Sequence, residues 1–166
     1  MGSLIRVTFV LALTSTGSTA HAELKVTSPA RACQVLKTVG FEKMSSWKAF
    51  SGQTYGCNSP YWQVGSGFPL PNNLAYYVDG TATKVTKASI VLNVNNAQQV
   101  SVANNLLLRA SLEMATALTG QGLPNEVENA ILADKPIMAR IGTANVEVTR
   151  ENWPTGQGYE IHVIVR

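Results

Sequence analysis

The segment from 97 to 119, AQQVSVANNLLLRASLEMATALT, constrains the fold most because it is the longest stretch with an unbroken helical period. Apolar residues recur there at alternating steps of three and four, which places a broad apolar stripe along one side of a helix. We therefore predict a long central helix, ended by Gly120-Gln121-Gly122. The stripe consists of Val100, Ala103, Leu107, Ala110, Met114 and Ala117, with Leu106 and Leu118 beside it.

The first 22 residues have the pattern of a secretory signal peptide. Arg6 precedes a mostly apolar run over 7–13, and small and polar residues follow up to Ala20-His21-Ala22. We predict cleavage after Ala22, export to the periplasm or out of the cell, and one α+β domain over 23–166. The apolar run is too short to remain as a stable membrane anchor.

Charge and cysteine content exclude several kinds of site. Removal of residues 1–22 leaves 12 Lys and Arg against 10 Asp and Glu, without a basic run of the kind that binds nucleic acid. Cys33 and Cys57 form an even pair in an exported chain, which predicts a disulfide. Because His162 is the only histidine of the predicted mature domain, we expect neither a metal site nor a cofactor.

The remaining elements follow from turn signals and alternation. Ser28-Pro29 opens a predicted helix over 29–39, and Leu123-Pro124 opens a helix after the central one. Asp79-Gly80 joins two extended runs, and the second of these requires a bulge near Thr86-Lys87 because its buried phase changes there. We predict an α+β fold: a mostly antiparallel sheet of about five strands, with a long central helix and two shorter helices packed on it. The expected strands are one at 54–57 or 61–64, then 74–78, 83–95, 137–150 and 159–166.

Two apolar residues lie away from the main stripe of the central helix. Leu108 and Leu112 are one turn apart and roughly opposite the stripe, with Arg109 beside them. One interpretation is that the predicted helix at 29–39 or the aromatic-rich segment 41–68 covers them. The other is that they form an interaction surface for a protein partner or a second copy of the chain.

The segment 41–68 carries seven of the eleven aromatic residues of the predicted mature domain. Large side chains of this kind can close one end of a core that lacks regular structure. Alternatively, Trp47, Tyr61 and Trp62 can stack against a saccharide. The adjoining loop 65–73, GSGFPLPNN, is the natural projecting element if the protein is a secreted enzyme inhibitor.

Catalytic signatures are weak throughout the sequence. Pairing of the last two strands about their loop would set Glu147 across from His162, an arrangement that is ordinarily surface electrostatics. No nucleophile motif accompanies this pair, so we predict no catalytic residue. The leading hypothesis is an exported, non-catalytic binding or protein-interaction module. The alternatives are a cell-envelope saccharide-binding protein or enzyme that uses the segment 41–68, and a secreted enzyme inhibitor.

Overall fold

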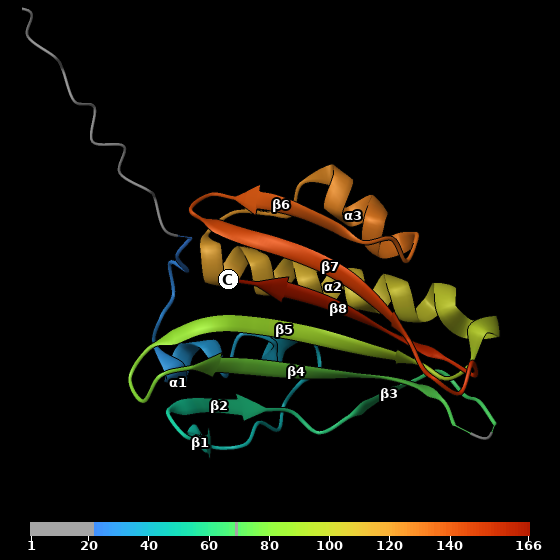
Figure 1. The fold of residues 1–166 in the computed structure, drawn as a ribbon, viewed down its shortest axis with the longest axis horizontal. Helices are drawn as coiled ribbons and strands as arrows, with labels where there is room; N and C mark the ends of the chain where they lie inside the picture. The colour runs from blue at the N-terminus through green and yellow to red at the C-terminus, as the bar shows by residue number, and fades with distance from the viewer. Residues whose placement is uncertain (1–21, 69) are drawn as a thin grey trace, which may run out of the picture.

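The computed structural model describes residues 22–68 and 70–166. The predicted signal peptide, apart from its last residue, lies outside the described residues. The fold is α+β with an antiparallel sheet, as predicted, but the sheet has eight strands instead of about five (Figure 1). The strand order is β1-β2-β4-β5-β8-β7-β6, with β3 also paired to β4. The strands are β1 (Lys48–Ser51), β2 (Thr54–Asn58), β3 (Trp62–Val64), β4 (Asn72–Gly80), β5 (Val85–Val94), β6 (Ile137–Ile141), β7 (Ala144–Asn152) and β8 (Tyr159–Val165).

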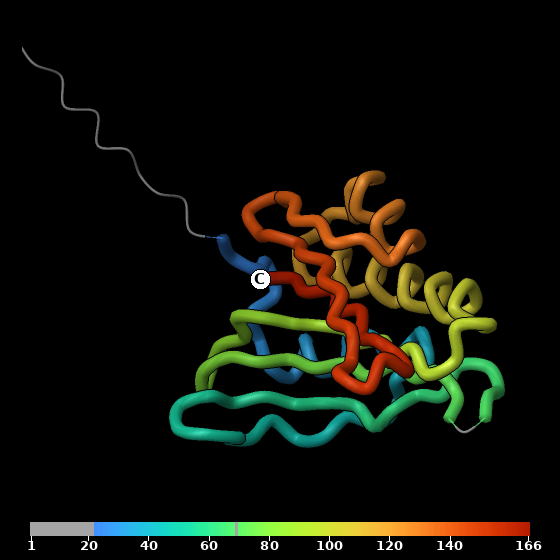
Figure 2. The backbone as a smooth tube through the Cα atoms, turned by 45° about the vertical axis from the view of Figure 1, so that its right-hand side comes forward, coloured from blue at the N-terminus to red at the C-terminus, as the bar shows by residue number. Residues whose placement is uncertain are grey.

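Three α-helices and two 3₁₀ turns complete the described chain. The helices are α1 (Pro29–Ala32), α2 (Val100–Thr119) and α3 (Asn125–Leu132), and the 3₁₀ turns are η1 (Lys37–Val39) and η2 (Ala97–Gln99). In Figure 1 α1 and α2 lie behind the sheet, and Figure 2 shows α2 and α3 to one side of the strands. Within the part of the chain that the structure describes, no helix is long and apolar enough to cross a membrane.

The core lies between α2 and the sheet. The main stripe of α2 is buried at Ala103, Leu107, Ala110, Met114 and Leu118. Alternate residues of the central strands are buried against it, so the predicted alternation of β5 and β8 is confirmed. These strand residues are Leu74, Tyr76 and Val78 of β4, Ala88, Ile90, Leu92 and Val94 of β5, and Ile161, Val163 and Val165 of β8.

Two features predicted from local turn signals, a bulge in β5 and the end of α2, are confirmed. The register of β4 and β5 passes from Asp79↔Lys87 to Gly80↔Val85, so Thr86 is the extra residue of a bulge. Gly120 ends α2 in a left-handed conformation with φ of 76°.

The first helix is shorter than the predicted 29–39. It consists of the single turn α1, followed by non-helical turns and then η1, and the Ser28 side chain makes no capping hydrogen bond. Gly40 ends this segment with φ of 111°, and a Cβ atom there would lie 2.7 Å from the Trp62 ring. The close approach of this ring explains why the chain must turn at a glycine.

Two errors account for most of the miscounted strands. The predicted strand 137–150 is two strands, because Gly142 adopts φ of 62° in a two-residue turn between Ile141 and Ala144. The segments 54–57 and 61–64, predicted as alternatives, both pair with β4. β1 was missed because all its residues are exposed, so no alternation marks it.

The disulfide between Cys33 and Cys57 is confirmed, with a Cα–Cα distance of 6.2 Å. It joins the segment after α1 to β2. The chain before α1 is held by backbone hydrogen bonds: Lys25 and Val26 donate to Leu118 O, and Val85 donates to Thr27 O. These links hold the first described residues against the end of α2 and the start of β5.

Candidate binding surface

One face of the sheet lies opposite α1, α2 and α3, and we call it the open face. Its composition follows from strand register, because directly paired residues of antiparallel strands share a face. The central rows of this face, from β4 through β5 and β8 to β7, combine polar, apolar and acidic residues. They are Asn73–Asn93–Glu160–Glu151, Ala75–Val91–His162–Thr149 and Tyr77–Ser89–Ile164–Glu147.

Tyr61 and Tyr77 bring an aromatic element to the open face. Burial raises the pKa of Tyr77 to about 12, and a hydrogen bond with Tyr61 and the charge of Glu160 act in the same direction. Tyr61 is 65% exposed, whereas Tyr77 is half-buried. Tyr77 therefore lies in one of the central rows of the open face, and Tyr61 lies just before β3, which pairs with the same strand.

A surface groove of about 560 Å³ continues this region past β3. It combines aromatic and aliphatic side chains with two side-chain amides. Leu70 is 59% exposed, and the neighbouring Phe68 is 96% exposed. Large apolar side chains exposed together on a protein surface are typical of interaction sites. The lining residues are Tyr61, Trp62, Gln63, Leu70, Pro71 and Asn73.

Asparagine and glutamine side chains hold the chain on both sides of this groove. Asn72 is fully buried, accepts hydrogen bonds at Oδ1 from the backbone N–H groups of Asn95 (2.8 Å) and Asn96 (2.7 Å), and donates to Asn96 O. Asn95 Nδ2 donates to Pro71 O at 2.8 Å. At the other end of the loop, Ser66 N donates to Gln99 Oε1 at 2.9 Å. The groove is therefore held in place by η2 and the residues that precede it, which lowers the entropy cost of binding.

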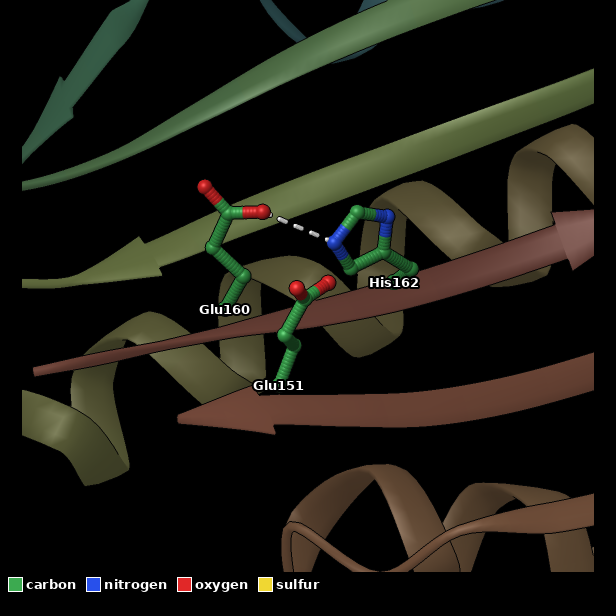
Figure 3. Close-up of side chains that lie close together, drawn as sticks. All are labelled: Glu151, Glu160 and His162. Atoms are coloured by element: carbon green, nitrogen blue, oxygen red, sulfur yellow. Dashed lines mark hydrogen bonds and ion pairs between the residues drawn. The ribbon is translucent and has the colours of Figure 1, made fainter. Parts of the chain in front are cut away.

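His162 lies on the open face, but its predicted neighbour was wrong. Thr149, not Glu147, opposes His162 across β7 and β8. Glu147 opposes Ile164 and forms an ion pair with Arg166 at 2.8 Å. Figure 3 shows His162 beside Glu160 and Glu151, and its Nε2 atom lies 2.9 Å from Glu160 Oε2.

The predicted interaction residues of α2 lie on a different part of the molecule. Leu108 and Leu112 are half-buried and pack against the core, whereas Arg109 is exposed. At 100° per residue they lie on the flank of α2 that also carries Asn104, whose Nδ2 donates to Leu132 O at 3.3 Å. At Asn104 this flank of α2 therefore contacts α3.

The three predicted stacking residues do not form one platform. Tyr61 and Trp62 line the groove together, and the Phe41 ring packs edge-on against Trp62 with centroids 5.1 Å apart. Trp47 lines a separate surface pocket with Pro29 and Ala82 and donates from Nε1 to Ala82 O at 3.2 Å. Only the Tyr61–Trp62 pair can therefore contact one ligand.

The structure also brings together residues that no sequence motif connects. Asn72 and Asn95 are 23 positions apart, and Glu151 and Glu160 belong to different strands. The dipeptides Asn72-Asn73 and Asn95-Asn96, each at a strand end, were the available signal for the first pair.

Comparison with known proteins finds no family model, no characterised protein and no solved structure that matches this chain.

Proposed function

We propose that the protein is an exported, non-catalytic module that binds a protein partner through the groove and the adjoining open face. The observation that carries this proposal is the groove itself, where exposed Tyr61 and Leu70 lie beside the amides of Gln63 and Asn73. Aromatic residues are enriched at the centres of protein interfaces, and polar groups at their rims. Export is supported by the signal-peptide pattern and by the Cys33–Cys57 disulfide, which suits an oxidising compartment.

The preformed geometry of the groove favours binding. Hydrogen bonds in which the side chains of Asn72 and Gln99 accept and that of Asn95 donates hold the chain that carries Leu70 and Pro71. A surface that is ordered before its partner arrives loses less conformational entropy on association. Such a surface needs no reactive group to perform its function.

Site-specific photocrosslinking in the native cell envelope tests the proposal. We would replace Leu70 with a photoreactive phenylalanine analogue and identify crosslinked proteins by mass spectrometry under non-reducing conditions. The matched control is Val102, which is 60% exposed on α2 and does not line the groove. The expected result is one protein adduct from position 70 that is missing from position 102.

Two further variants connect the adduct to the groove. Tyr61→Ala and Gln63→Ala should each lower the yield of the adduct at least threefold without changing the far-UV circular dichroism. An adduct with twice the mass of the chain would identify the partner as a second copy. Equal labelling from positions 70 and 102, or none from position 70, contradicts the proposal.

A saccharide ligand is the second candidate, favoured by the joint lining of the groove by Tyr61 and Trp62. This alternative predicts quenching of tryptophan fluorescence on addition of cell-wall fragments. The quenching should be lost in Trp62→Phe and retained in Trp47→Phe, because Trp47 lines a different pocket.

A further inference from the structure

Glu151, Glu160 and His162 form a compact cluster of possible metal ligands on the open face. Each offers one ligand atom, and the three atoms all lie within 4.8 Å of one another. Glu151 and Glu160 oppose each other directly across β7 and β8, and His162 lies two positions further along β8 on the same face (Figure 3). The paired strands β7 and β8 form a rigid support that positions all three residues.

Within the described residues, no lysine or arginine forms an ion pair with this cluster. Two carboxylates directly opposite each other in a sheet repel, which destabilises the pair. Among the ion pairs of the described residues, Glu160 contacts only His162, and none involves Glu151. Arg150, next in sequence to Glu151, is paired with Ile161 of the other face and stacks on the Tyr159 ring at 3.7 Å.

Partial burial strengthens the case for a bound cation. The side chains of Glu160 and His162 are only 31% and 25% exposed, so water screens their charges less than at an open surface. The neighbouring open-face residues across the strands are Asn93, Val91 and Thr149, which carry no charge. A divalent cation would remove the repulsion between the two carboxylates.

We propose that Glu151, Glu160 and His162 bind a divalent first-row transition metal, with Zn²⁺ as the best match. An imidazole nitrogen together with carboxylate oxygens suits Zn²⁺ better than Mg²⁺ or Ca²⁺, which prefer oxygen ligands alone. Three protein ligands leave a coordination position for water, as in open zinc sites. Both cysteines are in the disulfide, so thiolates do not compete for the metal within the described chain.

The distances require only a small adjustment of side chains. Zinc lies about 2.0–2.2 Å from nitrogen and oxygen ligands, so tetrahedral ligand atoms are roughly 3.3–3.6 Å apart. His162 Nε2 and Glu160 Oε2 are already 2.9 Å apart. The exposed Glu151 side chain at the end of β7 can rotate to close the remaining distance.

Isothermal titration calorimetry with zinc chloride tests the site directly. The untagged predicted mature domain, residues 23–166, would be used, because His162 is its only histidine. We expect one zinc ion per chain, and a loss of affinity of at least tenfold in each of Glu151→Gln, Glu160→Gln and His162→Gln. Cobalt substitution should give a visible absorption spectrum that His162→Gln changes.

Glu147→Gln is the matched control, because Glu147 lies on the same strand and face but is paired with Arg166. Its zinc affinity should remain within twofold of the parent. Circular dichroism of each variant shows that the fold is retained. Absence of zinc binding, equal binding in His162→Gln, or an equal loss in Glu147→Gln would each overturn the proposal, which does not depend on the partner proposed above.

Discussion

At the scale of single residues, Asp134 joins two helices to the sheet. Its Oδ1 accepts a hydrogen bond from Asn104 Nδ2 and its Oδ2 accepts one from Tyr159 OH, both at 2.6 Å. Its backbone has φ of 54°, a conformation that Asp and Asn adopt more readily than other non-glycine residues. The residue therefore holds the end of α3 against α2 and β8.

Asp134→Asn should lower the free energy of unfolding by about 1–3 kcal/mol, measured by urea denaturation. Asparagine tolerates the same φ, but it replaces one charged acceptor with an NH₂ group. Both hydrogen bonds then lose their charge assistance, and the Tyr159 hydroxyl would have to accept instead of donate. Asp79→Asn is the control, because the ion pair of Asp79 with Lys87 is partly exposed and should contribute less than about 1 kcal/mol. Equal losses in the two variants would contradict this role for Asp134.

Tyr76 gives the protein a predicted sensitivity to alkaline pH. Burial raises the pKa of Tyr76 well above its usual value, and its hydroxyl donates to Ala32 O at 2.9 Å. In the unfolded chain this phenol ionises near pH 10, whereas in the folded protein it keeps its proton. Above about pH 10 the unfolded state therefore binds fewer protons, and the free energy of unfolding falls as pH rises.

We expect the contribution of Tyr76 to be complete below about pH 10 and to be lost progressively above it. Urea denaturation at pH 9 and pH 11 should show a smaller pH dependence in Tyr76→Phe than in the parent. The same variant should lose about 1 kcal/mol at neutral pH with its hydrogen bond. An unchanged pH dependence would show that Tyr76 already ionises in the folded state.

At the scale of elements, α2 has two flanks with different roles. The flank that carries Leu108 and Leu112 is half-buried and packed against the core, whereas Val102 is 60% exposed. A charged side chain costs free energy when it is placed among apolar neighbours, and little at an exposed position. The two flanks therefore provide a comparison within one helix.

The double variant Leu108→Asp, Leu112→Asp should lower the free energy of unfolding by about 2–4 kcal/mol. Val102→Asp should change it by less than about 0.5 kcal/mol. Thermal and urea unfolding measure both effects. If the double variant were as stable as the parent but lost an oligomer or partner, these leucines would instead belong to an interface.

At the scale of the whole molecule, the disulfide connects the helical layer to the sheet. Cys33 follows α1 and Cys57 lies in β2, with a separation of 24 residues. In the chain-entropy model, closing a loop of this length lowers the conformational entropy of the unfolded chain. This raises the free energy of unfolding by roughly 3.5 kcal/mol. The bond thereby stabilises the part of the sheet that has the shortest strands.

Cys33→Ala, Cys57→Ala should lower the free energy of unfolding by roughly 3 kcal/mol, measured in urea without reductant. The parent protein in reductant should approach the stability of the double variant, and reductant should not affect the variant itself. A loss below about 1 kcal/mol would contradict a stabilising role of the cross-link.

Much of the fold could be predicted from the sequence because it depends on nearby residues. Local periodicity and turn chemistry predicted three features: the apolar stripe of α2, the bulge at Thr86 and the left-handed end at Gly120. The disulfide was predictable for a different reason, since only two cysteines exist. These features together determined the α+β class.

Strand register was decided only by the tertiary structure. A slip of two residues keeps every side chain on its face but changes every partner, so alternation alone cannot distinguish the two registers. The predicted partner of His162 was therefore Glu147, whereas the observed partner is Thr149. The observed register also brings Glu151 opposite Glu160. The hydrogen bond between Asn72 and Asn95, which helps to hold the groove, joins residues far apart in the sequence, and periodicity does not encode such contacts.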